Sequence, residues 1–269
     1  MLRSMNEMKT YSVVSSAGKT DVVGQVYDFY FDDATWATRY MVVDLGTWLP
    51  GRKVLISPVA LAQPDWGGGV SFPVNLRREE IESSPSIDTS QPVSRQDEEV
   101  LIDHYDWPAY WNDVNFYDAQ AVGMNPKAYV DSRRVANKVH AQVAEKVAPE
   151  RTVAAETETV PSLRSLNEVT GSYIEATDGD IGHVEELIVD TETWEIRYLV
   201  IDTKNWWPGK KVIISPKWVS TIDWDDKRVG VDLTREDIKS APEYDSKVPV
   251  NRDYETHLFD YYGRPYYWS

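Results

Sequence analysis

The sequence predicts a mainly β protein made of two tandem copies of one small antiparallel barrel, each followed by short helices. A long stretch occurs twice, because residues 36–58 reappear as residues 194–216. Across residues 19–66 and 177–224, 19 of 48 aligned positions are identical. Within each copy, short apolar or alternating segments are separated by turn residues at close spacing, which is typical of a small barrel or sandwich. The chain is therefore expected to be a duplicated domain.

The second copy shows the expected strands most clearly. One strand begins with Trp194, Ile196 and Tyr198 on one face and ends with residues that are apolar on both faces, which is typical of a strand covered on both sides. Pro208 and Gly209 then suit a type II turn, because proline presets φ and glycine accepts a positive φ. The expected strands are residues 182–190, 194–202, 211–215, 217–223 and 228–233.

Short helices are predicted after each set of strands. Thr234 is a capping residue with an acidic residue three positions later, which predicts a helix that begins there. The first copy has Arg77 at this position, so its helix should begin less firmly. Tyr254, Leu258 and Tyr261 form an apolar stripe at helical spacing, and this tail helix is expected to pack on its own barrel.

The repeat divides the chain into two units and a linker. The first unit spans residues 1–111 and the second spans residues 161–269, and each has the size of a domain with its own core. Residues 112–160 have no second copy, and we expect an irregular linker that is partly helical over residues 127–147. Pro149 interrupts this segment.

Composition limits the classes of function. The 269 residues include 11 Trp and 16 Tyr, and 42% are hydrophobic, which is enough for two cores. The absence of cysteine excludes disulfides, thiolate catalysis and cysteine-ligated metals. The net charge of −16 disfavours direct contact with nucleic acid or anionic lipid, and favours a basic protein partner or simple solubility. No signal peptide or membrane span is recognisable, so we expect a soluble cytoplasmic protein.

Several blocks of the sequence resemble a PRC-barrel domain. They are Gly182-His183-Val184, residues 194–202, residues 211–216 and residues 234–242, and the first copy repeats them from Gly24 to Pro85. The resemblance implies a small, strongly bent antiparallel barrel that serves for docking and assembly. Its relatives include the cytoplasmic part of the photosynthetic reaction-centre H subunit and a ribosome-maturation factor. The resemblance implies no catalytic residues.

Acidic, histidine and serine residues form no recognisable catalytic or metal-binding set. Asp32 matches Asp190, and Asp44 matches Asp202. Such acids could hold a cation or act as acid and base, but aspartate at a turn commonly accepts hydrogen bonds from nearby backbone amides. The four histidines are not at ligand spacing, and the repeated serines each precede a proline. No metal, cofactor or enzymatic activity is therefore expected.

Tryptophans beside the Pro-Gly turns are the candidate contact points. Trp36, Trp66 and their copies, Trp194 and Trp224, are expected in the core. An aromatic ring next to a turn and a following cation instead suits an interface. The candidate interface residues are Trp48, Pro50, Arg52, Lys53, Trp206, Trp207, Pro208, Lys210 and Lys211.

The duplication as a whole predicts a non-enzymatic scaffold or adaptor. We expect the two copies to pack against each other with pseudo-twofold symmetry, as a dimer fused into one chain. One alternative is a small-molecule or sugar-binding protein that uses the Trp-lined loops. Others are a role like that of the reaction-centre H subunit in photosynthetic electron transfer, and a hydrolase that uses Asp32 or Asp190.

Overall fold

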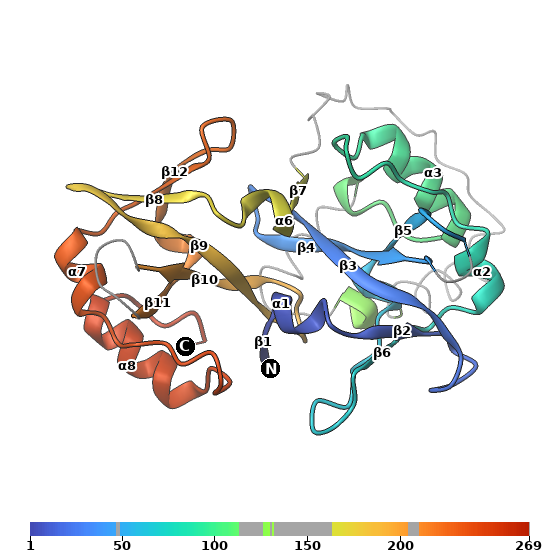
Figure 1. Cartoon of the computed structure of the whole chain (residues 1–269), viewed down its shortest axis with the longest axis horizontal. Helices are drawn as coiled ribbons and strands as arrows, with labels where there is room; N and C mark the ends of the chain where they lie inside the picture. Colours follow the sequence, from blue (N-terminus) through green and yellow to red (C-terminus); the bar gives the residue numbers. More distant parts are fainter. Residues whose placement is uncertain (47–48, 113–125, 130, 132–162, 204–209, 269) are drawn as a thin grey trace, which may run out of the picture.

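Two mixed β-sheets make up most of the protein. The computed structural model describes residues 1–46, 49–112, 126–129, 131, 163–203 and 210–268. The two sheets lie side by side, and α2 and α3 cover one outer end of the molecule while α7 and α8 cover the other (Figure 1). The first unit supplies most of one sheet, and the second unit supplies most of the other.

The described elements follow a similar order in both units, but the second unit has the additional strand β12 and the first has the additional short helix η2. The first unit contains β1 (Leu2–Ser4), α1 (Met5–Met8), β2 (Ser12–Val14), β3 (Val22–Asp32), β4 (Ala37–Asp44), β5 (Lys53–Ile56), η1 (Pro58–Ala60), β6 (Ser71–Pro73), α2 (Arg78–Glu82), α3 (Arg95–Tyr105) and η2 (Tyr110–Asn112). The second contains β7 (Leu163–Ser165), α6 (Leu166–Val169), β8 (Tyr173–Ala176), β9 (Gly179–Asp190), β10 (Ile196–Asp202), β11 (Lys211–Ile214), η3 (Pro216–Trp218), β12 (Val219–Asp223), β13 (Arg228–Val231), α7 (Arg235–Ser240) and α8 (Arg252–Tyr262).

Both sheets combine antiparallel and parallel pairs. The second unit has the strand order β11-β10-β9-β8-β13-β12, and the first has the order β5-β4-β3-β2-β6. Most pairs are antiparallel, as predicted, but β2 pairs with β6 and β8 with β13 in parallel. These parallel pairs arise because the chain crosses over the sheet before it forms the later strand. Neither sheet closes into a barrel among the described residues, so the mainly β character is confirmed but the two closed antiparallel barrels are not.

The central strands form where the sequence predicts them. Both faces of β10 are buried along its whole length, as its apolar second half indicates, and β4 is buried almost as fully. The type II turn predicted at Pro208 and Gly209 lies outside the described residues, but the aligned turn at Pro50 and Gly51 has that geometry. Arg52 N donates to Leu49 O at 3.0 Å, and Gly51 has a φ of +78°. Local pattern is therefore sufficient to place these elements.

The helix starts also follow the sequence. Thr234 Oγ1 accepts a hydrogen bond from Asp237 N at 3.1 Å at the start of α7. Arg77 cannot accept such a bond, so α2 begins without a side-chain cap and is one residue shorter than α7. The loose helix predicted over residues 127–147 lies mostly outside the described residues. Within that region, residues 126–129 and 131 are described and are helical.

The stripe predicted for the tail helix α8 is partly wrong. Leu258 is fully buried, but Tyr261 is 38% exposed. The buried face of α8 instead comprises Glu255, Leu258 and Phe259. The pattern misleads because Glu255 faces the sheet, where two tyrosines hydrogen-bond its carboxylate.

The two units exchange short strands with each other. Strand β1 pairs with β9 of the second unit, and β7 pairs with β3 of the first. Ser4, the N-cap of α1, donates to Glu186 on β9, and Ser165, the N-cap of α6, donates to Asp28 on β3. Asp28 and Glu186 are aligned positions of the repeat. Burial raises the pKa of both carboxyls.

The turns after β3 and β9 also pair across the same boundary. Thr38 N donates to Trp194 O, and Ile196 N donates to Trp36 O, each at 2.8 Å. Both tryptophans have positive φ values, +58° for Trp36 and +61° for Trp194. Reciprocal contacts of three kinds therefore join the units: the short strands, their capping serines and these turns.

Candidate functional site

Four of the nine candidate interface residues lie outside the described residues. Trp48, Trp206, Trp207 and Pro208 fall in the two segments that the structure does not describe, so their interface role stays a prediction. Pro50 is exposed at its turn.

The four candidate cations next to these segments make contacts within their own unit. Arg52 donates to Ser84 O, and Lys210 Nζ donates to Ala241 O at 2.7 Å. The ammonium of Lys53 lies 4.5 Å from the centroid of the Tyr27 ring. Lys211 Nζ pairs with a Glu185 carboxylate oxygen at 2.6 Å. These four side chains therefore hold strands and the segments after α2 and α7 in place.

The repeated aspartates stabilise turns. Asp32 Oδ1 accepts from Ala34 N at 3.0 Å, and Asp190 Oδ1 accepts from Glu192 N at 3.1 Å. Asp44 Oδ1 accepts from Gly46 N at 2.8 Å. Among the described residues, no group of three or more His, Asp or Glu side chains is arranged to hold a metal ion.

The first unit buries a glutamate that the sequence reasoning missed. Glu98 on α3 is fully buried and accepts from the hydroxyls of Tyr40 at 2.9 Å and Tyr110 at 2.8 Å. Arg95 pairs with the same carboxylate at 2.7 Å, and the Arg39 guanidinium lies 4.2 Å from the centroid of the Tyr110 ring. Burial raises the pKa of Glu98 and of Tyr40.

The second unit repeats this arrangement. Glu255 on α8 accepts from Tyr198 at 2.7 Å and Tyr267 at 2.6 Å, and pairs with Arg252 at 3.1 Å. The Arg197 guanidinium lies 4.3 Å from the Tyr267 ring centroid. The available signal was that all members of the set recur in the sequence repeat. Because protein groups surround each carboxylate, these sets fix the tail helices to the sheets and leave no room for a substrate.

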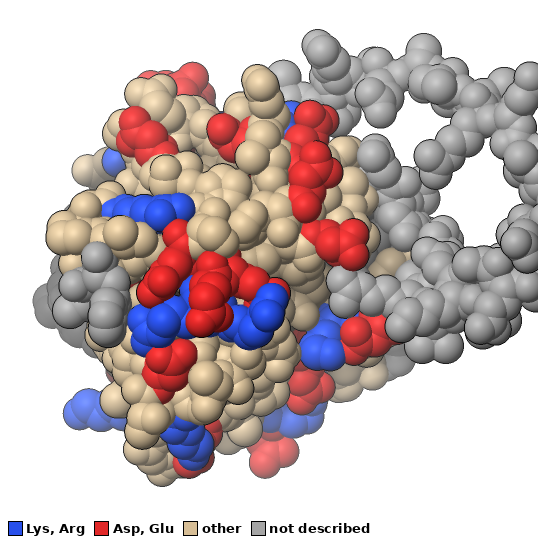
Figure 2. All heavy atoms as spheres, turned by 90° about the vertical axis from the view of Figure 1, so that its right-hand side faces the viewer, with Lys and Arg blue, Asp and Glu red and all other residues tan. Residues whose placement is uncertain are grey.

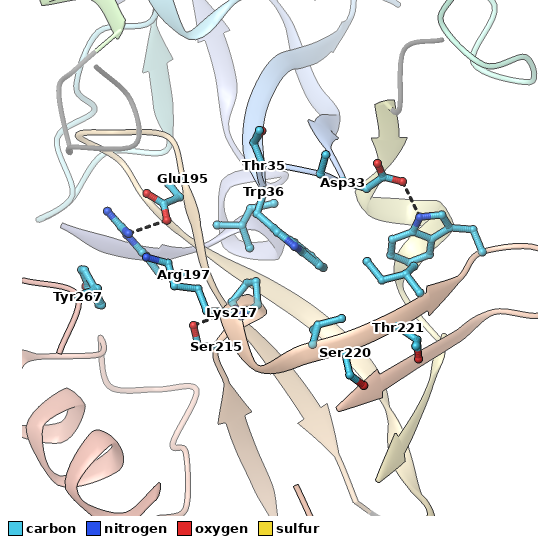
Figure 3. A pocket seen from close by; sticks show the side chains of 16 residues that line it. Asp33, Thr35, Trp36, Glu195, Arg197, Ser215, Lys217, Ser220, Thr221 and Tyr267 are labelled. Atoms are coloured by element: carbon cyan, nitrogen blue, oxygen red, sulfur yellow. Dashed lines mark hydrogen bonds and ion pairs between the residues drawn. The ribbon is translucent and has the colours of Figure 1, made fainter. Parts of the chain in front are cut away.

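A cavity of about 640 Å³ opens where the two units meet. We call it the junction cavity. It is bounded by residues 33–36 of the first unit and by the start of β10, η3, β12, Trp224 and Tyr267 of the second. Figure 3 shows the indole of Trp36 projecting from the first unit into this space, opposite Ser220 and Thr221 of β12.

Paired charges and one exposed lysine surround the junction cavity. Asp33 accepts a hydrogen bond from Trp224 Nε1 at 2.7 Å (Figure 3). Glu195 pairs with Arg197 at 2.7 Å, and burial raises the pKa of Glu195. Lys217 is exposed on η3, and its positive charge opposes that rise in the pKa of Glu195.

The corresponding place in the first unit is filled. Trp194, which aligns with Trp36, is only 3% exposed and packs against Phe29 and Phe72 at centroid distances of 6.4 and 6.0 Å. The aligned residues in the second unit are Leu187 and Val229, which leave Trp36 without equivalent ring partners.

Side chains also close the first unit over this place. Gln63 Nε2 donates to Thr191 O at 2.6 Å, and the aligned residue in the second unit is the shorter Thr221. Val59, which is buried, aligns with the exposed Lys217. A cavity of only about 20 Å³ remains in the first unit beside Arg39, Val59 and Tyr110.

Charged side chains are mixed on the end face of the first unit. Figure 2 shows acidic and basic groups interleaved on this face. Arg77 pairs with Glu80 at 3.0 Å, and Arg78 pairs with Asp21 and Glu82 on and beside α2. This face therefore presents no single-sign patch for an anionic polymer. In the described part of the chain, no helix has the length and hydropathy of a membrane span.

Comparison with known proteins identifies one domain. Residues 164–238, from β7 into α7, match the PRC-barrel domain family. No curated protein matches the chain. The second unit of this protein thus contains a PRC-barrel domain, a type of domain that serves in binding and assembly.

Proposed function

We propose that this protein is a non-enzymatic binding and assembly module, made of two PRC-type units that form a dimer within one chain. The observation that carries the proposal is the reciprocal exchange of β1 and β7, together with the PRC-barrel match in the second unit. An isologous contact of this kind is what a symmetric dimer makes. Because the two units are fused, they cannot dissociate. Side chains can therefore be replaced in one unit while the contacts of the other unit still stabilise the fold.

The contacts at the boundary support a permanent association of the units. Each short strand satisfies backbone groups of the other unit's sheet, and each capping serine satisfies a buried carboxylate there. Removing one unit would expose both sets of polar groups and the apolar residues beneath them. A protein partner with a neutral or basic surface is favoured because the chain carries a net charge of −16.

The two units expressed as separate chains test this proposal. Residues 1–112 and 163–269 should each be unstable or self-associate, and together they should form a stoichiometric one-to-one complex. The Ser4→Ala and Ser165→Ala changes should weaken the complex, and Ser90→Ala, which alters an exposed serine away from the boundary, is the matched control. Two stable, non-associating monomers would disprove the fused dimer.

The binding role needs its own measurement. The intact chain should bind a partner protein from its native cells in fixed stoichiometry, and a chain with the two serine changes should lose that binding. Turnover of a substrate by the purified chain would contradict the non-enzymatic proposal.

A second candidate function is favoured by the junction cavity. Its two indoles, Trp36 and Trp224, could contact the apolar faces of a sugar or another small molecule, and its volume lies within the range of about 300–1,000 Å³ that is usual for ligand sites. Quenching of tryptophan fluorescence by a metabolite, lost in Trp36→Ala, would support this function.

A further inference from the structure

The outer edge of β12 borders the junction cavity. Strand β12 is the last strand in its sheet, and among the described residues it pairs only with β13. Four successive residues, 219–222, line the cavity. These residues span a bulge between Val219 and Thr221, and the cavity contacts all four, so it is not confined to one face of the sheet and borders the strand's outer edge. The backbone groups of that edge are available to another strand.

The aligned segment of the first unit offers no such edge. Residues 61–65 do not form a strand there, and Leu61 makes a single bridge to Val74. Ala62 N donates to Pro73 O at 3.0 Å, and the Gln63 side chain crosses to Thr191 O. The second unit therefore differs from the first in both respects that matter for binding, because it has a cavity and a free strand edge beside it.

The chemistry of the cavity changes along β12. Lys217 lies just before the strand and supplies an exposed cation, whose positive charge also acts on the nearby Glu195 carboxyl. Trp36 and Trp224 supply half-buried rings beside the strand. Asp223 ends the strand and is exposed beside the cavity, next to the lining residues Ile222 and Trp224. An occupant thus meets a positive charge at one end, aromatic surface in the middle and a negative charge at the other end.

We propose that the junction cavity binds an extended segment of a partner protein, which adds to the sheet as a strand beside β12. The segment carries a carboxylate that pairs with Lys217 and an apolar side chain that contacts Trp36 and Trp224. A basic residue lies near Asp223. This inference rests on the proposed binding function and names the class of partner. The five residues of β12 can pair with a segment of about five residues, or about 17 Å of extended chain.

A displayed library of random linear peptides of about eight residues tests the proposal. The intact chain should enrich peptides that combine a carboxylate, a central apolar residue and a basic residue at the opposite end. Affinities of the synthetic peptides are then measured by fluorescence anisotropy. Two methylated versions of each peptide are compared, one with the odd-numbered and one with the even-numbered backbone nitrogens methylated. One version should bind about tenfold or more weakly and the other almost normally, because a strand bonds to its neighbour through alternate residues.

Variants of the cavity locate the binding site. Lys217→Glu should weaken the enriched peptides by about tenfold. Lys247→Glu makes the same charge change at an exposed site outside the junction cavity, and should leave affinity unchanged. A double variant, Lys217→Val with Thr221→Gln, introduces the closing residues of the first unit and should abolish binding. Both altered side chains are exposed, so these variants should fold, and thermal unfolding checks this.

Several results would overturn the inference. The inference would be wrong if no peptides were enriched, or if the enriched peptides bound the double variant as tightly as the wild type. It would also be wrong if both methylated versions lost the same amount of affinity. Binding of neutral oligosaccharides on a glycan array, lost in the double variant, would assign the cavity to a sugar instead. If the wild-type chain and the double variant capture the native partner equally well, the proposed binding function stands. The assignment of the binding site to the junction cavity is then wrong.

Discussion

Replacing Trp194 by alanine should destabilise the protein far more than replacing Trp36. Trp194 belongs to the second unit, but its ring packs between Phe29 and Phe72 of the first, and only 3% of the residue is exposed. Trp36 is half-buried and stacks on Phe31 of its own unit at 5.4 Å. The two aligned tryptophans thus have different surroundings despite similar backbone conformations.

The magnitude follows from the area that each ring buries. Truncating a buried Trp to Ala usually costs about 3–5 kcal/mol, so Trp194→Ala should fall in that range. Trp36 is less buried and borders a cavity, so Trp36→Ala should cost less, about 1–2 kcal/mol. Both changes retain the backbone hydrogen bonds at these positions, so the difference reports ring packing alone.

Urea unfolding of both variants measures the difference. A single cooperative transition is expected for the wild type, because the units exchange strands. Trp194→Gly is a useful control, since glycine tolerates the φ of +61° and should be no more destabilising than alanine. Equal losses for Trp194→Ala and Trp36→Ala, or a loss below about 1 kcal/mol for Trp194→Ala, would refute this account of the junction.

Two further predictions concern buried polar groups. Tyr198→Phe removes one of the hydroxyls that hydrogen-bond Glu255, and should cost about 1–3 kcal/mol in urea unfolding; no change would mean that the carboxylate is not held as described. Burial raises the pKa of Glu98 and Asp28, so the folded chain binds these protons more tightly than the unfolded chain and the two groups add stability as pH falls from neutral towards about 4. The N-cap hydroxyl of α7 lowers the pKa of Asp237, whose contribution is present above its unfolded pKa and lost on further acidification. The thermal midpoint should therefore be highest at mildly acidic pH, Glu98→Gln should reduce the rise, and a midpoint that falls steadily below pH 7 would contradict the assignment.

Elements that depend on neighbours in sequence could be predicted. The strands of the second unit, the cap at Thr234 and the turn at Gly51 follow from alternation, capping and φ preference. The tail helix was placed correctly, but its buried face was not. An apolar stripe cannot reveal that Glu255 faces inward, because its partners, Tyr198 and Tyr267, come from distant segments.

The junction could not be derived from local pattern. The repeat of Leu2-Arg3-Ser4 as Leu163-Arg164-Ser165 is visible in the sequence, but nothing local says that each triplet pairs with the other unit. The candidate site was therefore sought at the Pro-Gly turns. The described cations there hold their own unit together, whereas the cavity is lined by residues that differ from their aligned counterparts, such as Lys217 and Thr221 in place of Val59 and Gln63.

The duplication explains why one cavity can open without loss of the fold. A single unit cannot give up Phe29, Phe72 and the Gln63 contact without destabilising its own core. In the fused pair, the first unit retains these contacts, and the strand exchange shares their stabilisation with the second. The second unit can then hold Lys217 and Thr221 where the first has Val59 and Gln63, and these residues line the cavity beside Trp36. Under the proposed function, stability and binding are in this way carried by different units of one chain, which a symmetric homodimer could not achieve.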